Sequence, residues 1–396
     1  MVDPILASEE DWREAAQQWA KKTWISFILG GVIAALGAPI VGAIPCLYGC
    51  WCIICRCTST KNAERCKKSK ESLCEAYEIV SAMGHCPASS ADNETQKNSN
   101  QVITKQIAEL FLAEGYNVVP LHLFTSMTEA AAESLSKYRW DLELKGLTEI
   151  SEGVATALSK HQGGVERHLR KLHLRGLTEI SEGVATALSK RQGDLHLGGL
   201  TEISEGVATA LSKHQGGDLH LGGLTEISDA VATALSKRQA GEEGELDLGG
   251  LTEISEGVAT ALSKLQGNLG LHGLTEISEG VAESLSKTQG TLLLCSLTEI
   301  SEGVATALSK HQGTLLLGSL TEISEGVATA LSKHQEGELD LGGLTEISDA
   351  VATALSKHQG GKLNLGGLTE ISEEVAKSLS KYQGFLYLET TYLKKW

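Results

Sequence analysis

A cluster of cysteines near the N-terminus has the residue type and the spacing for metal binding or covalent modification. It comprises Cys46, Cys50, Cys52, Cys55 and Cys57, which fall within twelve residues at the end of an apolar run. Cys52 and Cys55 could share a zinc ion or act in redox chemistry, because thiolates three positions apart can bind one metal. The residues between these two cysteines, Ile53 and Ile54, are apolar, and lysines and arginines follow the cluster. Both features favour two other interpretations. The cysteines are small apolar residues of a membrane segment, or Cys50, Cys52, Cys55 and Cys57 are S-acylated.

Histidines and aspartates at regular intervals form a second pattern that could hold a metal. His173, His196 and His220 lie 23 and 24 residues apart, with Asp194 and Asp218 nearby. We favour a solvated polar column over a ligand set, and we predict no metal site and no cofactor. No phosphate-binding loop, nucleophile elbow or paired-carboxylate motif occurs in the sequence, so we predict that the protein is not an enzyme.

The elements that must position these side chains come from an internal repeat. Ten copies of one unit share a five-residue string, a further copy aligns at 120–137, and a last one begins at 385–388. Self-similarity at a fixed period of this length indicates a solenoid. The string Leu-Thr-Glu-Ile-Ser recurs at steps of 23 to 30 residues, with its threonine at Thr148, Thr178, Thr201, Thr225, Thr252, Thr275, Thr298, Thr321, Thr345 and Thr369.

One repeat, residues 194–215, predicts a strand, a turn and a short helix. Leu195 and Leu197 alternate with His196, as in a half-buried strand, and two glycines follow at a turn. Ser204 is the expected N-cap of a helix that Gly216 ends. The expected inward stripe comprises Ile203, Val207, Ala208 and Leu211, and the last turn is expected to include Lys213 and His214. Neither element buries its apolar side alone, so we expect a curved stack with twelve parallel strands ~4.8 Å apart.

The strand segment resembles the leucine-rich repeat family. Its Leu-x-Leu-x-x-Leu pattern, as in 195–200, and its period near 23 are similar to that family from Val119 to Trp396. The family's usual asparagine or cysteine after the strand is replaced by leucine, as at Leu200, and the following Thr201 is the expected substitute for its hydrogen bonds. The resemblance implies an α/β solenoid in the form of an arc, with a parallel strip on the concave face, helices on the convex face, and protein binding on the concave face.

The copies differ mainly at the outward strand position. The helix sequence is nearly invariant, and drift alone would have marked its exposed positions equally. We therefore predict that the concave face binds a partner, although drift in solvated positions is the alternative. We expect Leu293 and Leu316 to form an exposed apolar pair on this face. The predicted partner-binding residues are Glu143, His173, His196, His220, Asp247, Leu293, Leu316, Asp340, Asn364 and Tyr387, while Pro120 and Gly270 occupy the same position in other copies.

The net charge of −16 argues against a nucleic-acid partner, because phosphate backbones are bound by basic surfaces. The longest insertion between repeats, 163–171, nevertheless carries a basic spot. We expect this spot to meet an acidic partner or lipid head groups. It comprises Lys145, Arg167, Arg170, Lys171 and Arg175.

The region before the repeats predicts a membrane anchor. After a polar segment, 1–23, the 32 residues 24–55 carry no charge, which is enough for one membrane-spanning helix or for a re-entrant hairpin about Pro39. A signal peptide cleaved near Ala43 is the alternative. The basic residues that follow the segment would place the repeats on the cytoplasmic side of the membrane.

Four further segments complete the expected organisation. Residues 56–86 form a basic, helical juxtamembrane segment, and 87–100 form a flexible linker. Residues 101–117 form a helix that caps the stack, and 118–396 form a solenoid of eleven repeats plus a terminal strand.

These features predict a non-enzymatic, membrane-anchored scaffold that binds a protein partner. Near-identical copies behind an anchor with cysteines resemble repeat proteins that intracellular bacteria insert in host-facing membranes. One alternative is the repeat-containing substrate-recognition part of an enzyme complex. The other is a structural membrane protein that self-associates through an aromatic end made of Phe385, Tyr387, Tyr392 and Trp396.

Overall fold

The structure is a computed structural model that describes residues 102–116, 118–161, 171–239, 241 and 244–389. Contacts divide the chain into the units Met1–Cys74 and Glu75–Trp396, and all described residues belong to the second. The expected membrane segment, juxtamembrane segment, linker and cysteine cluster lie outside the described residues. In the described part, no helix is both long and apolar enough to cross a membrane.

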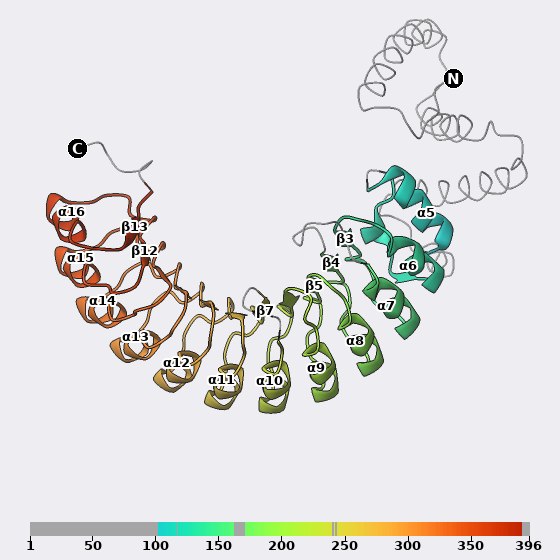
Figure 1. The fold of residues 1–396 in the computed structure, drawn as a ribbon, viewed down its shortest axis with the longest axis horizontal. Coiled ribbons are helices and arrows are strands. Elements are labelled where there is room, and N and C mark those ends of the chain that lie inside the picture. Colours follow the sequence, from blue (N-terminus) through green and yellow to red (C-terminus); the bar gives the residue numbers. More distant parts are fainter. Residues whose placement is uncertain (1–101, 117, 162–170, 240, 242–243, 390–396) are drawn as a thin grey trace, which may run out of the picture. The chain divides into compact units, whose positions relative to one another are not determined.

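Successive strand–turn–helix units stack into an arc, with the strands on the inner side and the helices on the outer side (Figure 1). Eleven strands form one sheet in sequence order, and every neighbouring pair is parallel. The predicted α/β solenoid is confirmed for these residues. The strands are β3 (Leu142–Glu143), β4 (Leu172–His173), β5 (Leu195–His196), β6 (Leu219–His220), β7 (Glu245–Asp247), β8 (Asn268–Gly270), β9 (Leu292–Leu293), β10 (Leu315–Leu316), β11 (Glu338–Asp340), β12 (Lys362–Asn364) and β13 (Phe385–Tyr387).

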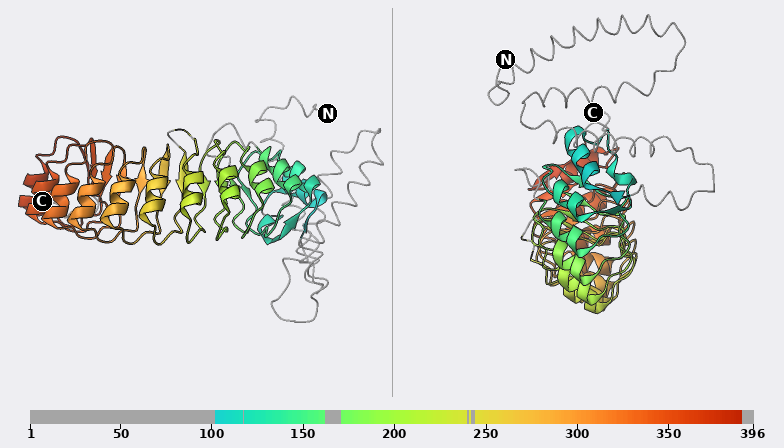
Figure 2. Two further views of the ribbon diagram at one scale, coloured as in Figure 1. Left: turned by 90° about the horizontal axis from the view of Figure 1, so that it is seen from below. Right: turned by 90° about the vertical axis from the view of Figure 1, so that its right-hand side faces the viewer.

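The convex side carries one short helix for each unit, and Figure 2 shows them side by side along the array. A two-turn helix is unstable alone in water, so its stability must come from packing. The helices are α6 (Glu129–Leu135), α7 (Glu152–Ser159), α8 (Glu182–Leu188), α9 (Glu205–Leu211), α10 (Asp229–Leu235), α11 (Glu256–Leu262), α12 (Glu279–Leu285), α13 (Glu302–Leu308), α14 (Glu325–Leu331), α15 (Asp349–Leu355) and α16 (Glu373–Leu379).

Serine caps start the helices as predicted, but their ends differ from the prediction. The Ser204 hydroxyl accepts the N–H of Val207 at 3.2 Å. Helix α9 ends at Leu211 with Ser212 as its C-cap, so His214 lies beyond the last turn and is fully buried. Ile203 is half-buried, and Ala210 fills the inward stripe instead. Ile203 precedes the N-cap Ser204, whose backbone is extended, so the helical spacing does not apply to it.

Leucines make the core of every unit. Leu195, Leu197 and Leu200 are fully buried, and each such side chain contributes about 2 kcal/mol when it is removed from water. Leu200 therefore fills the place of the family's asparagine with apolar packing. The expected threonine hydrogen bonds form at Thr148, whose hydroxyl donates to the Thr125 carbonyl at 3.3 Å, and at Thr369, whose hydroxyl donates to the Thr345 carbonyl at 3.2 Å.

The first copy departs from the predicted strand. Residues Leu121–Leu123 form a 3-10 helix after Pro120, so the sheet has eleven strands and not twelve. Proline fixes its own φ at about −65°, and Pro120 has a φ of −77°, away from the value of about −120° that is typical of a parallel strand, which accounts for the difference. The phenol oxygen of Tyr116 takes the place of the missing strand, because it accepts the N–H of Glu143 on β3 at 2.6 Å.

A helix and a small sheet cover this end of the stack. Helix α5 (Lys105–Glu114) begins at the Thr104 cap and packs on α6 through Ile107 and Phe111, which are buried. Strand β1 (Val102–Ile103) pairs in parallel with β2 (Ser126–Met127). The helix lies within the residues that the sequence assigns to a cap, whereas the strand β1 was not predicted.

A row of buried polar side chains runs through the loops that follow the helices. We call it the interior column: His161, Arg191, His214, Arg238, Leu265, Thr288, His311, His334, His358 and Tyr382, all at most 8% exposed. Several members bond a loop carbonyl of the preceding unit. The ring Nε2 atoms of His311 and His334 lie 3.0 and 2.9 Å from the carbonyls of Gly290 and Gly313, and the Tyr382 hydroxyl donates to Gly360 at 2.9 Å. Because a carbonyl only accepts, each of these ring nitrogens carries the proton.

Candidate binding surface

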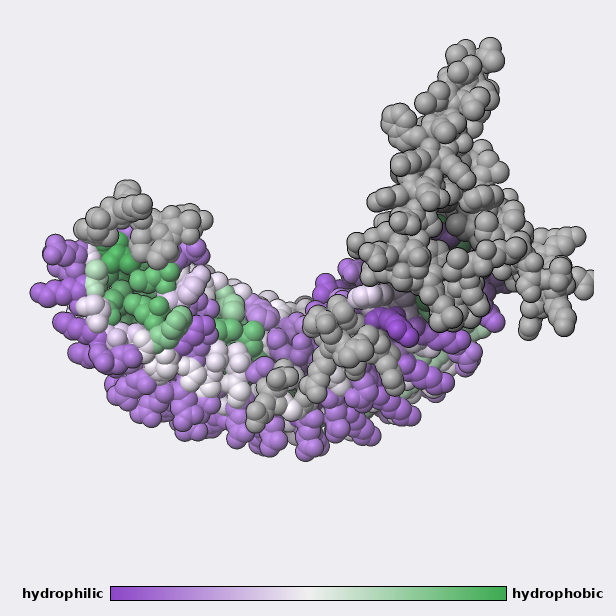
Figure 3. All heavy atoms as spheres, turned by 45° about the horizontal axis from the view of Figure 1, so that its top comes forward, coloured by the Kyte–Doolittle hydropathy of each residue, from purple (hydrophilic) through white to green (hydrophobic). Residues whose placement is uncertain are grey.

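The strand centres present one row of side chains to the concave side. We call it the outward column: Glu143, His173, His196, His220, Asp247, Gly270, Leu293, Leu316, Asp340, Asn364 and Tyr387. Each of them except Tyr387 lies between two buried leucines, because alternate residues of a strand point to opposite faces. Figure 3 shows a largely hydrophilic surface with hydrophobic patches toward the C-terminal end of this face. The structure thus places all ten predicted partner-binding residues in one continuous row.

The three histidines at the N-terminal end of the row stack on one another. Ring centroids are 4.1 Å apart for His173 and His196, and 3.9 Å apart for His196 and His220. The middle ring is consequently buried, at 4% exposure, so the expected solvated column is wrong at His196. Burial, followed by the charges of His220 and His173, lowers the pKa of His196 to about 2. This histidine is neutral at physiological pH.

The aspartates near the histidines serve the backbone and do not form a ligand set with the rings. An Asp194 carboxylate oxygen accepts the N–H of Asp218 at 3.1 Å, and Asp218 accepts the N–H of Glu245 at 2.9 Å. The same ladder recurs where Asn268 accepts the N–H of Thr291 at 2.8 Å. These side chains satisfy N–H groups just before the strands, which accounts for them without a ligand.

Three polar residues of the outward column also bond their own turns. The side chains of Asp247, Asp340 and Asn364 accept the N–H of the glycine two residues later, at 2.8, 2.8 and 2.9 Å. The Asn364 amide donates to Asp340 at 2.8 Å. These three residues therefore also have a structural role, because short polar side chains commonly stabilise turns in this way.

The apolar members lie toward the C-terminal end. Leu293 and Leu316 are direct neighbours on β9 and β10. Both are half-buried, so the expectation of an exposed pair is wrong, because adjacent strands cover the flanks of each side chain. Among the described residues of this end, the largest exposed apolar groups are Phe385, at 62%, and Tyr387, at 43%, on the edge strand β13.

The predicted basic spot is only partly described. Arg167 and Arg170 lie outside the described residues. Lys145 forms an ion pair of 2.8 Å with Glu143, which offsets its charge. The Glu143–His173 register places Lys145 and Arg175 on neighbouring units, and Lys171 precedes β4.

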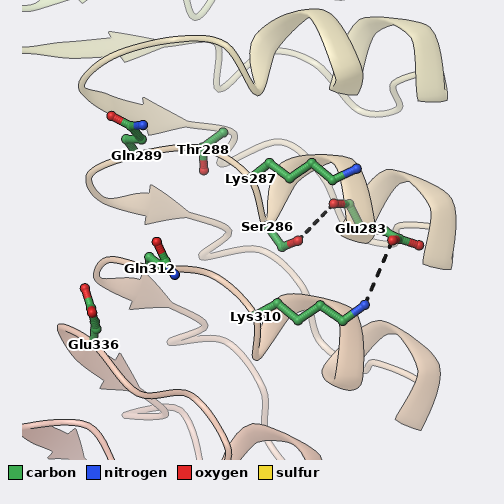
Figure 4. A pocket seen from close by; sticks show the side chains of 8 residues that line it. All are labelled: Glu283, Ser286, Lys287, Thr288, Gln289, Lys310, Gln312 and Glu336. Atoms are coloured by element: carbon green, nitrogen blue, oxygen red, sulfur yellow. Dashed lines mark hydrogen bonds and ion pairs between the residues drawn. The ribbon is translucent and has the colours of Figure 1, made fainter.

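A hollow on the flank of the array was not predicted. Its volume is about 460 Å³, and Figure 4 shows side chains from consecutive units around it. Lys310 and Glu283 pair across it at 3.9 Å, and Gln289 and Gln312 belong to a row of parallel backbone bridges. The recurring Ser-Lys-x-Gln segment is the signal that could have found it. Similar polar residues recur at the same positions in other units, so this hollow does not distinguish one place in the array. We therefore place the candidate surface on the concave face. The lining comprises Glu283, Ser286, Lys287, Thr288, Gln289, Lys310, Gln312 and Glu336.

Comparisons with known proteins find similarity at the level of shape. No model of a protein family matches the chain, and no curated protein matches it. A chain of the yeast Rad7 and Elc1 complex is similar at 12% identity and a TM-score of 0.37, over 89% of this chain and 98% of that chain.

A second solved structure is similar over a smaller share. It is the leucine-rich-repeat ectodomain of the plant membrane receptor kinase GASSHO1/SCHENGEN3 from Arabidopsis thaliana, in complex with Casparian strip integrity factor 2. The identity is 14% and the TM-score is 0.27, over 72% of this chain and 43% of that chain. This chain thus spans less than half of that ectodomain chain.

The repeat geometry itself defines the fold. Each complete unit places two leucines on a short parallel strand, a third leucine after the turn, and a capped helix on the convex side. The chain therefore has the leucine-rich-repeat-like solenoid fold that its strand pattern predicted.

Proposed function

We propose that the protein is a non-enzymatic scaffold that binds a partner protein on its concave face. The observation that carries this proposal is the contrast within each unit. The convex helix is nearly identical from copy to copy, whereas the outward column changes from acid to histidine to leucine to tyrosine. Both faces contact solvent, so solubility alone gives no reason for one to vary and the other not.

The C-terminal half of the face is the better docking region. In the N-terminal half the histidines stack on one another and Lys145 pairs with Glu143. Leu293 and Leu316 instead leave part of their surface to solvent, and Tyr387 is exposed. Interfaces are centred on apolar and aromatic groups with a polar rim, and this half of the face has that composition.

Affinity capture with the full-length chain tests the proposal. The variant Leu293→Glu with Leu316→Glu puts two charges on the C-terminal half of the face, and we expect it to lose at least about tenfold in partner recovery. The control is Thr306→Glu with Thr329→Glu, which adds the same charges to exposed helix positions of the same two units. If both variants retain the same partners as the wild type, the concave face is not the binding surface.

We further propose that residues 24–55 anchor the protein in a membrane, with the repeats on the cytoplasmic side. The uncharged length and the basic residues that follow it support this assignment. The same features support S-acylation of the cysteine cluster and a host-facing role in an intracellular bacterium. Carbonate extraction of the full chain should leave it in the membrane fraction, and deletion of 24–55 should release it. Release of the full chain by carbonate would overturn the anchor.

Self-association is a second candidate, favoured by one observation. Phe385 is 62% exposed on β13, the edge of the sheet among the described strands. An exposed edge strand with aromatic side chains can pair with another chain. Sedimentation of the wild type and of Phe385→Glu distinguishes the candidates, because a concentration-dependent oligomer that the substitution abolishes supports self-association. A monomeric wild type excludes it.

A further inference from the structure

Three metal-ligating side chains converge at the middle of the concave face, where β7 lies beside β8. Glu245 and Asp247 are the first and third residues of β7, so both point to this face. His272 follows β8 by two residues and joins them there. One ligand atom from each lies within 4.8 Å of the others. Among the described residues, no other set of three histidines, cysteines or acids meets this condition.

A glycine provides the space into which these side chains point. Gly270 is the only glycine of the outward column, and it lies opposite Asp247 in the register. A Cβ atom at Gly270 would lie 2.6 Å from Glu245 Oε1 and 3.1 Å from His272 Nε2. A Cβ at Gly249 would lie 2.9 Å from Asp247 Oδ1. Any larger residue at Gly270 would therefore fill the notch between the ligands.

A thiol stands next to the three side chains. Cys295 occupies the same position in its unit as His272 does in the preceding one, and it is half-buried with no disulfide partner. Its thiol is near enough to the His272 ring to influence it, but it is not one of the three groups whose ligand atoms already lie within 4.8 Å of one another. At this position the units before and after the two carry Gly249 and Gly318, so a histidine and a cysteine in succession depart from the local pattern.

The neighbours hold the carboxylates in place. Asp247 Oδ2 lies 3.1 Å from His220 Nδ1, and Asp247 Oδ1 accepts the N–H of Gly249 at 2.8 Å. Glu245 Oε1 lies 3.7 Å from His272 Nε2. Ligands around a four-coordinate zinc ion are about 3.4 Å apart, since zinc bonds to nitrogen and oxygen are close to 2.1 Å. The ligand atoms of Glu245, Asp247 and His272 lie within 4.8 Å of one another, and rotation of the Cys295 side chain is needed to bring its sulfur into the set.

We propose that Glu245, Asp247, His272 and Cys295 bind a divalent transition metal ion of the zinc class. The donors are two carboxylate oxygens, one imidazole nitrogen and one thiolate sulfur. Magnesium and calcium favour sites of oxygen alone, whereas zinc accepts nitrogen, oxygen and sulfur together. The ion lies between the histidine stack and the Leu293–Leu316 pair, so it adds positive charge to the middle of the proposed docking face. The site goes beyond the proposed partner binding and does not depend on it.

Metal titration of the full-length chain tests this site. The other eight cysteines all precede residue 87, and they are replaced by alanine so that Cys295 is the only thiol. The metal-free chain is titrated with Co²⁺, followed by its visible and thiolate charge-transfer absorption, and with Zn²⁺ by calorimetry. We expect one equivalent of either metal, a charge-transfer band that Cys295→Ala removes, and a higher thermal midpoint with Zn²⁺.

Two variants in the same background separate a built site from scattered binding. Gly270→Leu keeps all four donors and fills the notch, with the residue that the next two units carry there. His272→Gly restores the glycine of the neighbouring units. Each should weaken Zn²⁺ binding at least about tenfold, while His173→Ser, which removes a histidine from the same face, should leave it unchanged. The proposal is overturned if the parent chain takes up no metal, or if Gly270→Leu and His272→Gly both bind as the parent does.

Discussion

Each successive unit contributes one residue to the interior column and one to the outward column, and both columns include histidines, but these rings meet opposite surroundings. In the interior column His311 and His334 bond loop carbonyls of the unit before and are closed off from water. In the outward column His173 and His220 lie on the concave surface, and only His196 is enclosed, by the other two rings. The same residue type therefore joins units in one column and lines the candidate binding surface in the other.

This difference shows how buried loop carbonyls are satisfied at several junctions between units. A buried backbone carbonyl needs a donor, and here the donor comes from the chain after the helix. Histidine, arginine and tyrosine all serve in the interior column because each brings an N–H or O–H to nearly the same place. Leu265 occupies the interior column without a donor, so the feature that its members share is burial, and only some of them also donate to a loop carbonyl.

The largest expected effect comes from reversing that donor. His334→Glu places an acceptor, or a buried charge, against the Gly313 carbonyl and should lower the free energy of unfolding by about 3 kcal/mol. Thr329→Glu, exposed on the helix of the same unit, should change it by less than about 0.5 kcal/mol. Urea unfolding followed by circular dichroism measures both. Equal midpoints for the two variants would mean that the interior column does not join the units.

A second prediction uses acid to separate the columns. Burial, followed by nearby positive charges, lowers the pKa of the interior His214 and His334 to about 4 from an ordinary value of 6.5. The unfolded chain then binds more protons below pH 6.5, so stability is complete above that pH and falls as the pH drops toward 4. Between pH 7.5 and 5 each of these histidines should remove up to about 2 kcal/mol.

The matched variant for this prediction is His214→Leu with His334→Leu, since Leu265 already occupies the interior column of another unit. It should be less stable than the wild type at pH 7.5 and should lose less stability between pH 7.5 and 5. His173→Ser, in the outward column, should change that slope less, because its ring is only half-buried. An unchanged slope in the double leucine variant would show that the interior rings are not the groups that titrate.

Periodicity in the sequence predicted the units, the strand and helix of each, and the serine cap, because these depend on a single repeat. The alternation of Leu195 and Leu197 with His196 also identified the outward column. Pro120 contained the signal for its own exception, since the φ angle that proline fixes is not that of a parallel strand. Alignment with later copies outweighed that signal.

The missed features depend on contacts between units. His214 was assigned to the last turn of the helix because a basic side chain suits the negative end of a helix. The presence of Leu265 and Tyr382 at the same place in other units was the available signal that this position is buried. The burial of His196 follows from ring stacking across three strands, and the cluster at His272 requires Gly270 in one unit and Glu245 in another. The sequence pattern of a single repeat does not show these contacts, because the residues come from different units.

The smallest expected effect concerns an outward residue with two roles. Asp340→Ala removes the acceptor of the Gly342 N–H and of the Asn364 amide, and should cost about 1 kcal/mol of unfolding free energy. Asp340→Asn keeps a carbonyl oxygen in place of Oδ1 and should cost less than about 0.5 kcal/mol. If the partner recognises the negative charge of Asp340, Asp340→Asn should weaken binding, measured by calorimetry with the captured partner. The free energy of unfolding, measured with urea, should stay unchanged. If both variants lose stability equally and binding follows stability, Asp340 belongs with the interior column as a structural residue, and the functional surface contracts to the leucine pair and the exposed aromatic end.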